Sequence, residues 1–210
     1  MIEQPLLFAA DGLATLVFAT TGALVASRKE LDIFGFMWFA AITGIGGGTL
    51  RDLLLGLPVF WVVNPIPLAL CLATAVALHF TASRVQSRMA LILWLDALGL
   101  GFAAIAGTLK AVDSGTPGLV AVVMGVFSGC VGGIIRDTLG QEPSIILRRE
   151  VYVTAAAVGA TATVIILQGE AGRPLAAAAG FVLVVALRGA ALMRNLTLPA
   201  FRPRKGRDYS

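Results

Sequence analysis

Continuous apolar runs separated by short polar links dominate the chain. Seven of these runs approach the length of about 20 residues that an α-helix needs to cross a bilayer. They are Leu6–Ala26, Leu31–Leu54, Asn64–Ala82, Ala90–Ala111, Gly118–Leu139, Val151–Leu167 and Pro174–Met193. Apolar residues do not alternate with polar ones, as they would in the strands of a membrane β-barrel. The pattern therefore predicts an all-α membrane protein with seven transmembrane helices.

The composition supports a bilayer as the solvent of this fold. Of the 210 residues, 58% are hydrophobic and only 13% are charged, whereas a typical soluble domain carries about 25% charged residues. The links are too short to hold a soluble domain. Residues 1–210 are thus expected to form one transmembrane domain, ending in a disordered basic tail over about residues 200–210.

Basic residues concentrate in the links after the first, third and fifth runs and in the C-terminal tail. Cytoplasmic loops carry an excess of Lys and Arg, so we expect the N-terminus outside and the C-terminus in the cytoplasm. The basic residues are not gathered on one face or helix, which argues against nucleic acid as a partner.

Few side chains suit catalysis or metal binding. His79 is the only histidine, and the two cysteines, Cys71 and Cys130, each lie within an apolar run. The chain shows no metal-ligand spacing and no nucleophile with a neighbouring base. We therefore expect neither an enzyme nor a resident metal or cofactor.

The sequence repeats itself at an offset of 85 residues. Asp11 aligns with Asp96, and residues 44–52 align with residues 129–137 without a gap, both reading Gly-x-x-Gly-Gly-x-x-Arg-Asp. Each copy spans three apolar runs, at about residues 6–82 and 90–167. Because three is odd, the second copy enters the membrane from the opposite side. The chain is predicted to hold two inverted three-helix repeats and a seventh helix at about residues 174–193.

The repeated glycines lie on the second and fifth helices, and two interpretations remain open. Small residues allow close helix packing, whereas a glycine-weakened segment can kink and line a wet path. Thr43 and Ser128 precede the first glycine of each copy, and their hydroxyls suit either an ion's hydration shell or a bond back to their own helix. The candidate pore or kink residues are Thr43, Gly44, Gly46, Gly47, Gly48, Ser128, Gly129, Gly132 and Gly133.

Charged residues within apolar helices form a second candidate set. Each costs about 2.5–3.5 kcal/mol at the centre of a membrane helix, so each must pair, reach the interface or line a gate. The candidate gating residues or charge pairs are Arg51, Asp52, Arg136, Asp137, Asp11 and Asp96. Topology places Arg51 toward the outside and Arg136 toward the cytoplasm. Lys110 is expected at the interface, and Arg188 is expected to snorkel to the cytoplasmic side or to bind anionic lipid head groups.

With these paired motifs, the chain resembles the prokaryotic branch of the trimeric intracellular cation (TRIC) channel family. The resemblance covers essentially the whole chain and rests on residues 47–52 and their copy, residues 132–137. It implies a homotrimer in a prokaryotic inner membrane, with a pore in each protomer lined by the kinked second and fifth helices. It also implies conduction of monovalent cations, potassium or sodium, with membrane lipids as further partners, one of them a candidate bound ligand.

Two other functions stay open. The same sequence domain is also labelled a glycine transporter, so the alternative is a secondary transporter of a small zwitterion such as glycine. Inverted repeats are common in such transporters. A third hypothesis is a structural membrane protein whose glycines only pack. For cation conduction, the arginines must be neutralised by Asp11, Asp52, Asp96 or Asp137.

Overall fold

The computed structural model describes residues 3–84, 88–144, 150–169 and 172–199. The tail expected to be disordered, residues 200–210, lies outside the described residues. Within the described ranges the fold is helical, with one isolated antiparallel bridge between Glu150 and Thr197. The helices are α1 (Glu3–Arg28), α2 (Ile33–Leu54), α3 (Phe60–Val63), α4 (Ile66–Thr81), the 3₁₀ turn η1 (Ala82–Arg84), α5 (Arg88–Asp113), α6 (Gly118–Leu139), α7 (Val153–Leu167) and α8 (Arg173–Arg194).

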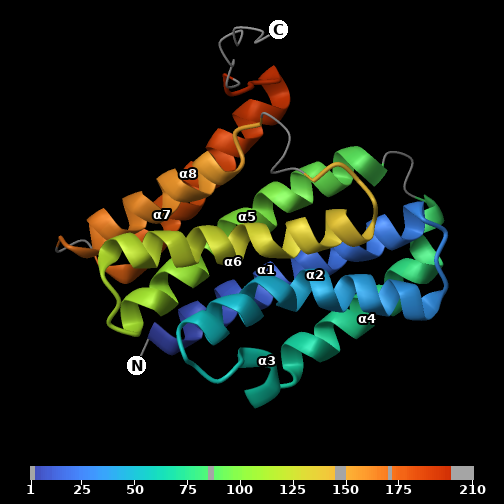
Figure 1. Cartoon of the computed structure of the whole chain (residues 1–210), viewed down its shortest axis with the longest axis horizontal. Helices are drawn as coiled ribbons and strands as arrows, with labels where there is room; N and C mark the ends of the chain where they lie inside the picture. Colours follow the sequence, from blue (N-terminus) through green and yellow to red (C-terminus); the bar gives the residue numbers. More distant parts are fainter. Residues whose placement is uncertain (1–2, 85–87, 145–149, 170–171, 200–210) are drawn as a thin grey trace, which may run out of the picture.

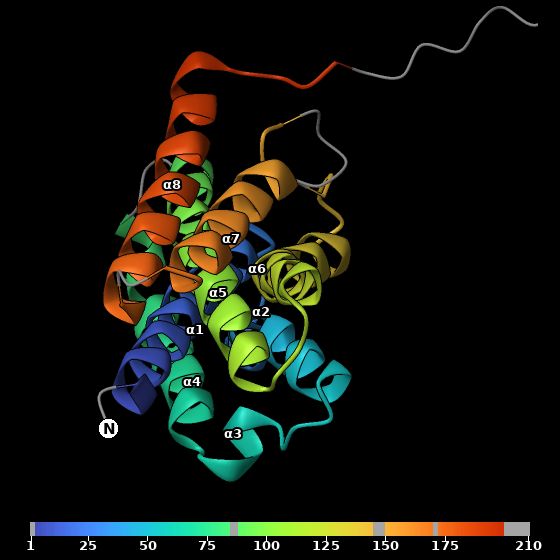
Figure 2. The ribbon, with the colours of Figure 1, turned by 90° about the vertical axis from the view of Figure 1, so that its left-hand side faces the viewer.

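Four long helices form the centre of the bundle. Figure 1 shows α1, α2, α5 and α6 lying along the long axis of the molecule, and α1 packs on both α2 and α5 while α6 packs on both α5 and α2. The view along the bundle in Figure 2 places α3 and α4 on one side and α7 and α8 on the other. The two helices that carry the glycine motif therefore meet at the middle of the molecule.

The buried apolar residues form two larger cores and smaller clusters that join the two halves. One core joins α1, α2 and α4, with Ile92 of α5, through residues such as Ala19, Phe39 and Cys71. The other joins α5, α6, α7 and α8 through Leu100, Cys130 and other residues. Smaller clusters, such as that of Phe18 on α1 and Ala103 on α5, connect the two halves.

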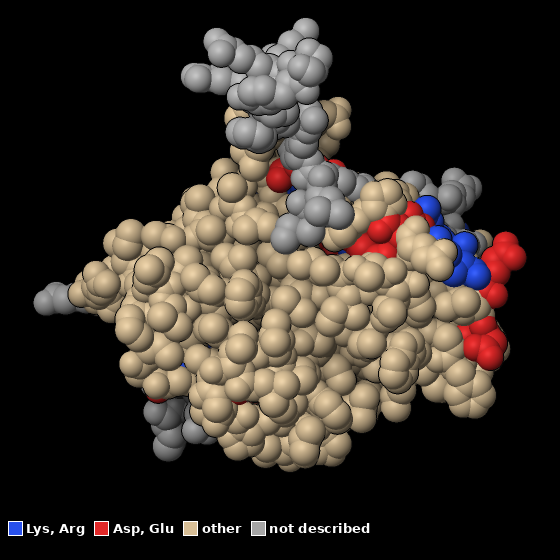
Figure 3. Space-filling view, viewed as in Figure 1, with Lys and Arg blue, Asp and Glu red and all other residues tan. Residues whose placement is uncertain are grey.

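The exterior suits hydrocarbon. Large apolar side chains such as Phe34, Trp38 and Leu119 are exposed, and Figure 3 shows a face that is almost free of charge, with the visible Lys, Arg, Asp and Glu gathered mainly near one end. Six of the described helices are long and apolar enough to cross a bilayer. The chain is accordingly a multi-pass membrane protein.

The sixth predicted span is shorter than the sequence suggested. It begins at Val153 instead of Val151, and α7 has 15 residues, which is about 22 Å of helix against a hydrocarbon core of about 30 Å. The third span is also trimmed, because α4 begins at Ile66, after Pro65, and ends at Thr81. The short helix α3, which the apolar pattern did not separate, precedes it.

The glycine motifs do not interrupt their helices. Both α2 and α6 continue as α-helix through the motif to Leu54 and Leu139, so neither helix unwinds at its glycines. The intrinsic penalty of glycine, about 1 kcal/mol each, is offset because a packed helix in lipid has no water to compete for its backbone hydrogen bonds. A bend at these glycines stays a prediction.

Candidate functional site

Two glycines bring the backbones of α2 and α6 into contact. A Cβ atom on Gly47 would lie 2.2 Å from the carbonyl oxygen of Ser128, and one on Gly132 would lie 2.5 Å from the carbonyl oxygen of Thr43. Thr43 and Ser128 are themselves related by the 85-residue offset, so the two contacts are reciprocal. The glycine faces therefore show the close helix packing that one interpretation of the motif predicted.

The remaining glycines of the motif face other helices. A Cβ on Gly44 would lie 3.0 Å from the carbonyl oxygen of Thr15 on α1, and one on Gly129 would lie 3.2 Å from that of Leu100 on α5. Gly46 differs, because its Cβ would meet only the tip of a flexible side chain, at 3.2 Å. Each motif helix is thus pressed against the first helix of its own half as well as against the other motif helix.

An unpaired hydroxyl lies at the crossing. Thr43 is fully buried, and its Oγ1 has no hydrogen-bond partner among the described residues. The alternative in which this hydroxyl bonds back to its own helix is therefore not observed. Ser128 is also buried. A buried hydroxyl without a partner costs free energy, so Thr43 Oγ1 is an unsatisfied polar group at the crossing.

The first charge cluster centres on Arg51. Its Nη1 and Nη2 atoms donate to the two oxygens of Asp11 at 2.7 and 3.2 Å, and its Nε donates to Oδ1 of Asp52 at 2.8 Å. Lys110 approaches the same Oδ1 at 2.8 Å, and the Phe60 N–H donates to Oδ2 at 2.9 Å. Two cations and two carboxylates balance here, although Arg51 and Asp52 are completely buried.

The second cluster repeats this arrangement 85 residues later. Arg136 donates from Nη1 to Asp96 at 2.7 Å and from Nε and Nη2 to Asp137 at 2.9 and 2.8 Å. It also donates to the Thr21 hydroxyl of α1 at 3.0 Å. Both arginines are thus neutralised by the aspartates considered from the sequence, and neither snorkels to an interface.

An aromatic residue lies against the last glycine of each motif. The Phe60 ring would lie 2.7 Å from a Cβ on Gly48, and the Tyr152 hydroxyl would lie 3.1 Å from one on Gly133. The guanidinium of Arg51 also sits 5.7 Å from the centre of the Phe60 ring, within cation–π range. Sequence reasoning missed both aromatics because they lie outside the motif and do not align at the 85-residue offset.

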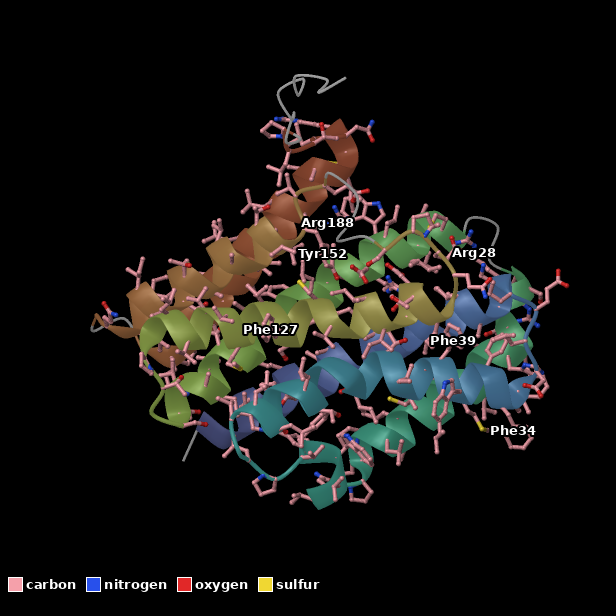
Figure 4. The ribbon with its side chains drawn as sticks, in the orientation of Figure 1. Arg28, Phe34, Phe39, Phe127, Tyr152 and Arg188 are labelled. Carbon is pink, nitrogen blue, oxygen red and sulfur yellow. The ribbon has the colours of Figure 1, made fainter. Side chains whose placement is uncertain are left out.

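The predicted position of Arg188 at the cytoplasmic interface was wrong. It neither snorkels nor reaches the surface, because its side chain is fully buried, with Nη2 lying 2.6 Å from Oε2 of Glu150. Its guanidinium lies 5.3 Å from the centre of the Tyr152 ring, and Figure 4 shows the two labelled side chains next to each other. The helix outside the repeat is therefore tied to the aromatic beside the second cluster.

Replacing Arg188 with Met is expected to lower the stability of the detergent-solubilised protein. Removing one partner of a buried ion pair strands the other, which costs several kcal/mol. Adding Glu150→Gln should recover part of the loss in a thermal unfolding experiment. Arg194→Met, at an exposed position of the same helix, is the control and should change little. An equal loss in both single variants would contradict a specific role for Arg188.

Small cavities lie beside both clusters. One of ≈10 Å³ is lined by Asp11, Gly47, Ser128 and neighbours, and another of ≈10 Å³ is lined by Arg136, Asp137 and neighbours. Each has room for about one water molecule. A hydrated ion does not fit in either space, and the backbones of α2 and α6 touch between the clusters.

This geometry defines the class of protein. Intramembrane ionisable residues paired with one another are typical of ion and substrate pathways, and the two arginines lie on the two helices that cross at the centre. Within the described residues, no group of three His, Cys, Asp or Glu side chains suits a metal ion. The class is a membrane transport protein.

The comparisons identify the family. A family model described as "Glycine transporter" matches twice, at residues 8–83 and 93–168. A UPF0126 membrane protein of Vibrio cholerae is 38% identical over 95% of this chain and 84% of that protein. The UPF0126 inner membrane protein YadS of Escherichia coli K12 is also 38% identical, over 91% of this chain and 94% of its own length.

Solved structures of similar proteins support the same family assignment. The TRIC channel orthologue from Rhodobacter sphaeroides is 47% identical, with a TM-score of 0.88 over 90% of this chain and 98% of that one. A prokaryotic TRIC channel crystallised in 0.5 M KCl is 26% identical, with a TM-score of 0.85 over 91% of this chain and 98% of that one. The chain belongs to this family of prokaryotic TRIC channels and UPF0126 membrane proteins, a channel family and not one of enzymes.

Proposed function

We propose that this protein is a potassium-permeable cation channel, a homotrimer in which each protomer conducts along α2 and α6. The observation that carries the proposal is the pair of buried Arg–Asp clusters, one on each of these helices, on either side of their glycine crossing. The TRIC relatives, described as trimeric cation channels, support the same function.

The electrostatics of the clusters are compatible with cations. A bare guanidinium in a low-dielectric pathway would repel potassium strongly. Arg51 is held by Asp11 and Asp52, and Arg136 by Asp96 and Asp137. The arginines can therefore fix the carboxylates in place without presenting an uncompensated positive charge to an ion.

Conduction requires the crossing to open. With the backbones in contact at Gly47 and Gly132, a separation or bend of α2 and α6 at these glycines would widen the space around Thr43 and Ser128. The hydroxyls would then replace part of the ion's hydration shell, and the two Arg–Asp clusters would act as gates at either mouth. The glycine faces thus pack in the closed form and move in the open one.

The same proposal includes the topology. We place the N-terminus outside and the C-terminus in the cytoplasm of the inner membrane, following the distribution of Lys and Arg. The two halves are inverted repeats, and α7 completes the second half as a short crossing. The reciprocal contacts of Gly47 and Gly132, which share the 85-residue offset, support a two-fold relation between the halves.

Recording from the purified protein in planar bilayers tests the function. Unitary currents in KCl, with a reversal potential in a salt gradient that follows potassium and not chloride, are the expected result. The second candidate, a glycine transporter, is favoured by the description of the matching family model. Saturable glycine uptake into proteoliposomes without unitary currents would replace the channel with that transporter.

A further inference from the structure

Phe60 lies between two cavities of very different size. One, of ≈560 Å³, lies beside the first charge cluster and is lined mostly by residues of α1, the link before α3, α3 and α4. Its rim is open, since Phe8 and Val63 are 52% and 69% exposed. The other is the water-sized cavity at the glycine crossing, which Gly47 and Ser128 line. The Phe60 side chain lines both, so it forms part of the wall between the open space and the crossing.

Asp11 is the other residue that lines both cavities, and it is fixed in place. Its two carboxylate oxygens accept hydrogen bonds from Nη1 and Nη2 of Arg51 at 2.7 and 3.2 Å. Moving this carboxylate would take one partner from a completely buried guanidinium, which is costly. Phe60 carries no charge, so moving its ring is the easier way to join the two cavities.

Several contacts hold the Phe60 ring in its present position. Its Cε1 atom would lie 2.7 Å from a Cβ on Gly48, so the ring occupies space that a side chain on that residue would fill. The charged groups of Arg51 and Lys110 lie 5.7 and 5.9 Å from the ring centre, within cation–π range. The backbone N–H of Phe60 donates to Oδ2 of Asp52 at 2.9 Å. The ring is thus seated on the last glycine of the motif and on the first charge cluster.

The segment that carries Phe60 has room to move. The helix α3 has only four residues, and besides the contacts of Phe60 it is tied to α2 by a hydrogen bond from Trp61 Nε1 to Thr49 Oγ1 at 2.8 Å. The link from α2 contains Gly56, whose φ is +66° and whose Cβ would meet nothing within 4 Å. Glycine changes its backbone angles at little steric cost, so this link can act as a hinge for α3.

The aromatic residue beside the second cluster is held more firmly. Tyr152 lies against Gly133 as Phe60 lies against Gly48, but Tyr152 is 1% exposed whereas Phe60 is half-buried. The fully buried guanidinium of Arg188 lies 5.3 Å from the Tyr152 ring centre. Of the two aromatics, Phe60 is therefore the one with freedom to leave its seat.

We propose that Phe60 gates the mouth of the pathway at the first cluster. Its ring closes the passage from the ≈560 Å³ cavity to the crossing, and the passage opens when α3 moves away from α2 on the link around Gly56. An apolar constriction excludes water and ions by dewetting. Because Gly48 follows Gly47, a bend of α2 at the crossing also shifts the seat of the ring, which couples the two movements. The inference rests on the proposed function for the statement that ions use this passage.

A cysteine in the inner cavity tests whether the ring is a barrier. Thr15 lines that cavity and is 1% exposed, so Thr15→Cys is a near-isosteric reporter. The full-length protein in detergent is treated with 2-aminoethyl methanethiosulfonate, a small cationic thiol reagent, and labelling is followed by intact mass. Phe60→Ala should raise the labelling rate of the reporter roughly tenfold, about 1.4 kcal/mol in the barrier. Phe60→Leu, which keeps apolar contact with Gly48 but loses the flat ring, should give a smaller rise.

Phe8→Ala is the matched control, because Phe8 lines the large cavity and not the small one. It should leave the labelling rate of Thr15→Cys unchanged. Phe60→Ala without the reporter should not be labelled, since Cys71 and Cys130 are both buried. An unchanged rate in Phe60→Ala, or an equal rise in Phe8→Ala, would overturn the gate. If Phe60→Ala did not fold, the rate in Phe60→Leu would decide in the same way.

Recordings in planar bilayers separate the gate from the channel proposal itself. Phe60→Ala should raise the open probability severalfold, whereas Phe8→Ala should not. Faster labelling in Phe60→Ala with an unchanged open probability would show that ions take another route, which would overturn the gate. Faster labelling with no unitary current in any variant, the parent protein included, would support Phe60 as a barrier and overturn the channel.

Discussion

Gly47→Ala is expected to raise the open probability of the potassium channel severalfold, because the added methyl group forces apart the two helices whose separation opens the path. The added methyl group would lie 2.2 Å from the carbonyl oxygen of Ser128, far inside the contact distance of about 3.5 Å. A backbone carbonyl has no rotamer by which to escape, so α2 and α6 must move apart by roughly 1 Å. Overpacking of this kind costs about 1–3 kcal/mol, and Gly132→Ala should act in the same way on Thr43.

Gly46→Ala is the matched control for this experiment. It makes the same change in helix propensity one residue earlier, but its methyl group would meet only the Cδ1 atom of Ile135, at 3.2 Å. Both variants should be recorded in bilayers after size-exclusion chromatography has shown the same assembly. If Gly47→Ala conducted as Gly46→Ala does, the crossing would lie outside the ion pathway.

Arg136→Gln is expected to cause the largest loss of stability among the single substitutions considered. It leaves the carboxylates of Asp96 and Asp137 in the protein interior without the guanidinium that contacts both. Removing one partner of a buried ion pair costs about 3–5 kcal/mol. The apparent melting temperature of the detergent-solubilised protein should fall accordingly.

The first cluster provides the comparison. Arg51→Gln should cost less, because Lys110 remains 2.8 Å from Asp52, whereas Arg136 is the one cation that contacts Asp96 within the described residues. Adding Asp96→Asn to Arg136→Gln should recover part of the lost stability, since it removes one stranded charge. A greater loss for Arg51→Gln, or no recovery in the double variant, would contradict this account of the clusters.

Much of the candidate site could be predicted from the sequence, because the repeat shows which residues occupy equivalent positions in the two halves. The offset of 85 residues made Asp11 and Asp96 candidate partners of the arginines, and the structure pairs Asp11 with Arg51 and Asp96 with Arg136. The motif also placed its glycines on helix faces. Helical periodicity does not identify the helix that packs against a given face. The close approach of Gly47 and Gly132 to backbone carbonyls of the opposite helix therefore could not be predicted from the sequence.

One prediction failed for an identifiable physical reason, and another stays open. The glycine run was open to either close packing or a kink; α2 is one continuous α-helix, and a bend at these glycines stays a prediction. Arg188 was expected at the surface because a lone arginine in an apolar helix usually snorkels. Its partner Glu150 comes from a different part of the chain and draws it inside.

By itself, the sequence determined that this is a membrane protein with two copies of a glycine and Arg–Asp motif, because hydropathy and repetition are local properties of the chain. The tertiary structure alone decided that Phe60 and Tyr152 cover the motifs, that Lys110 joins only the first cluster, and that a large apolar cavity lies beside it. These features depend on contacts between residues distant in sequence, whose partners are set by how the helices pack and not by any pattern along the chain.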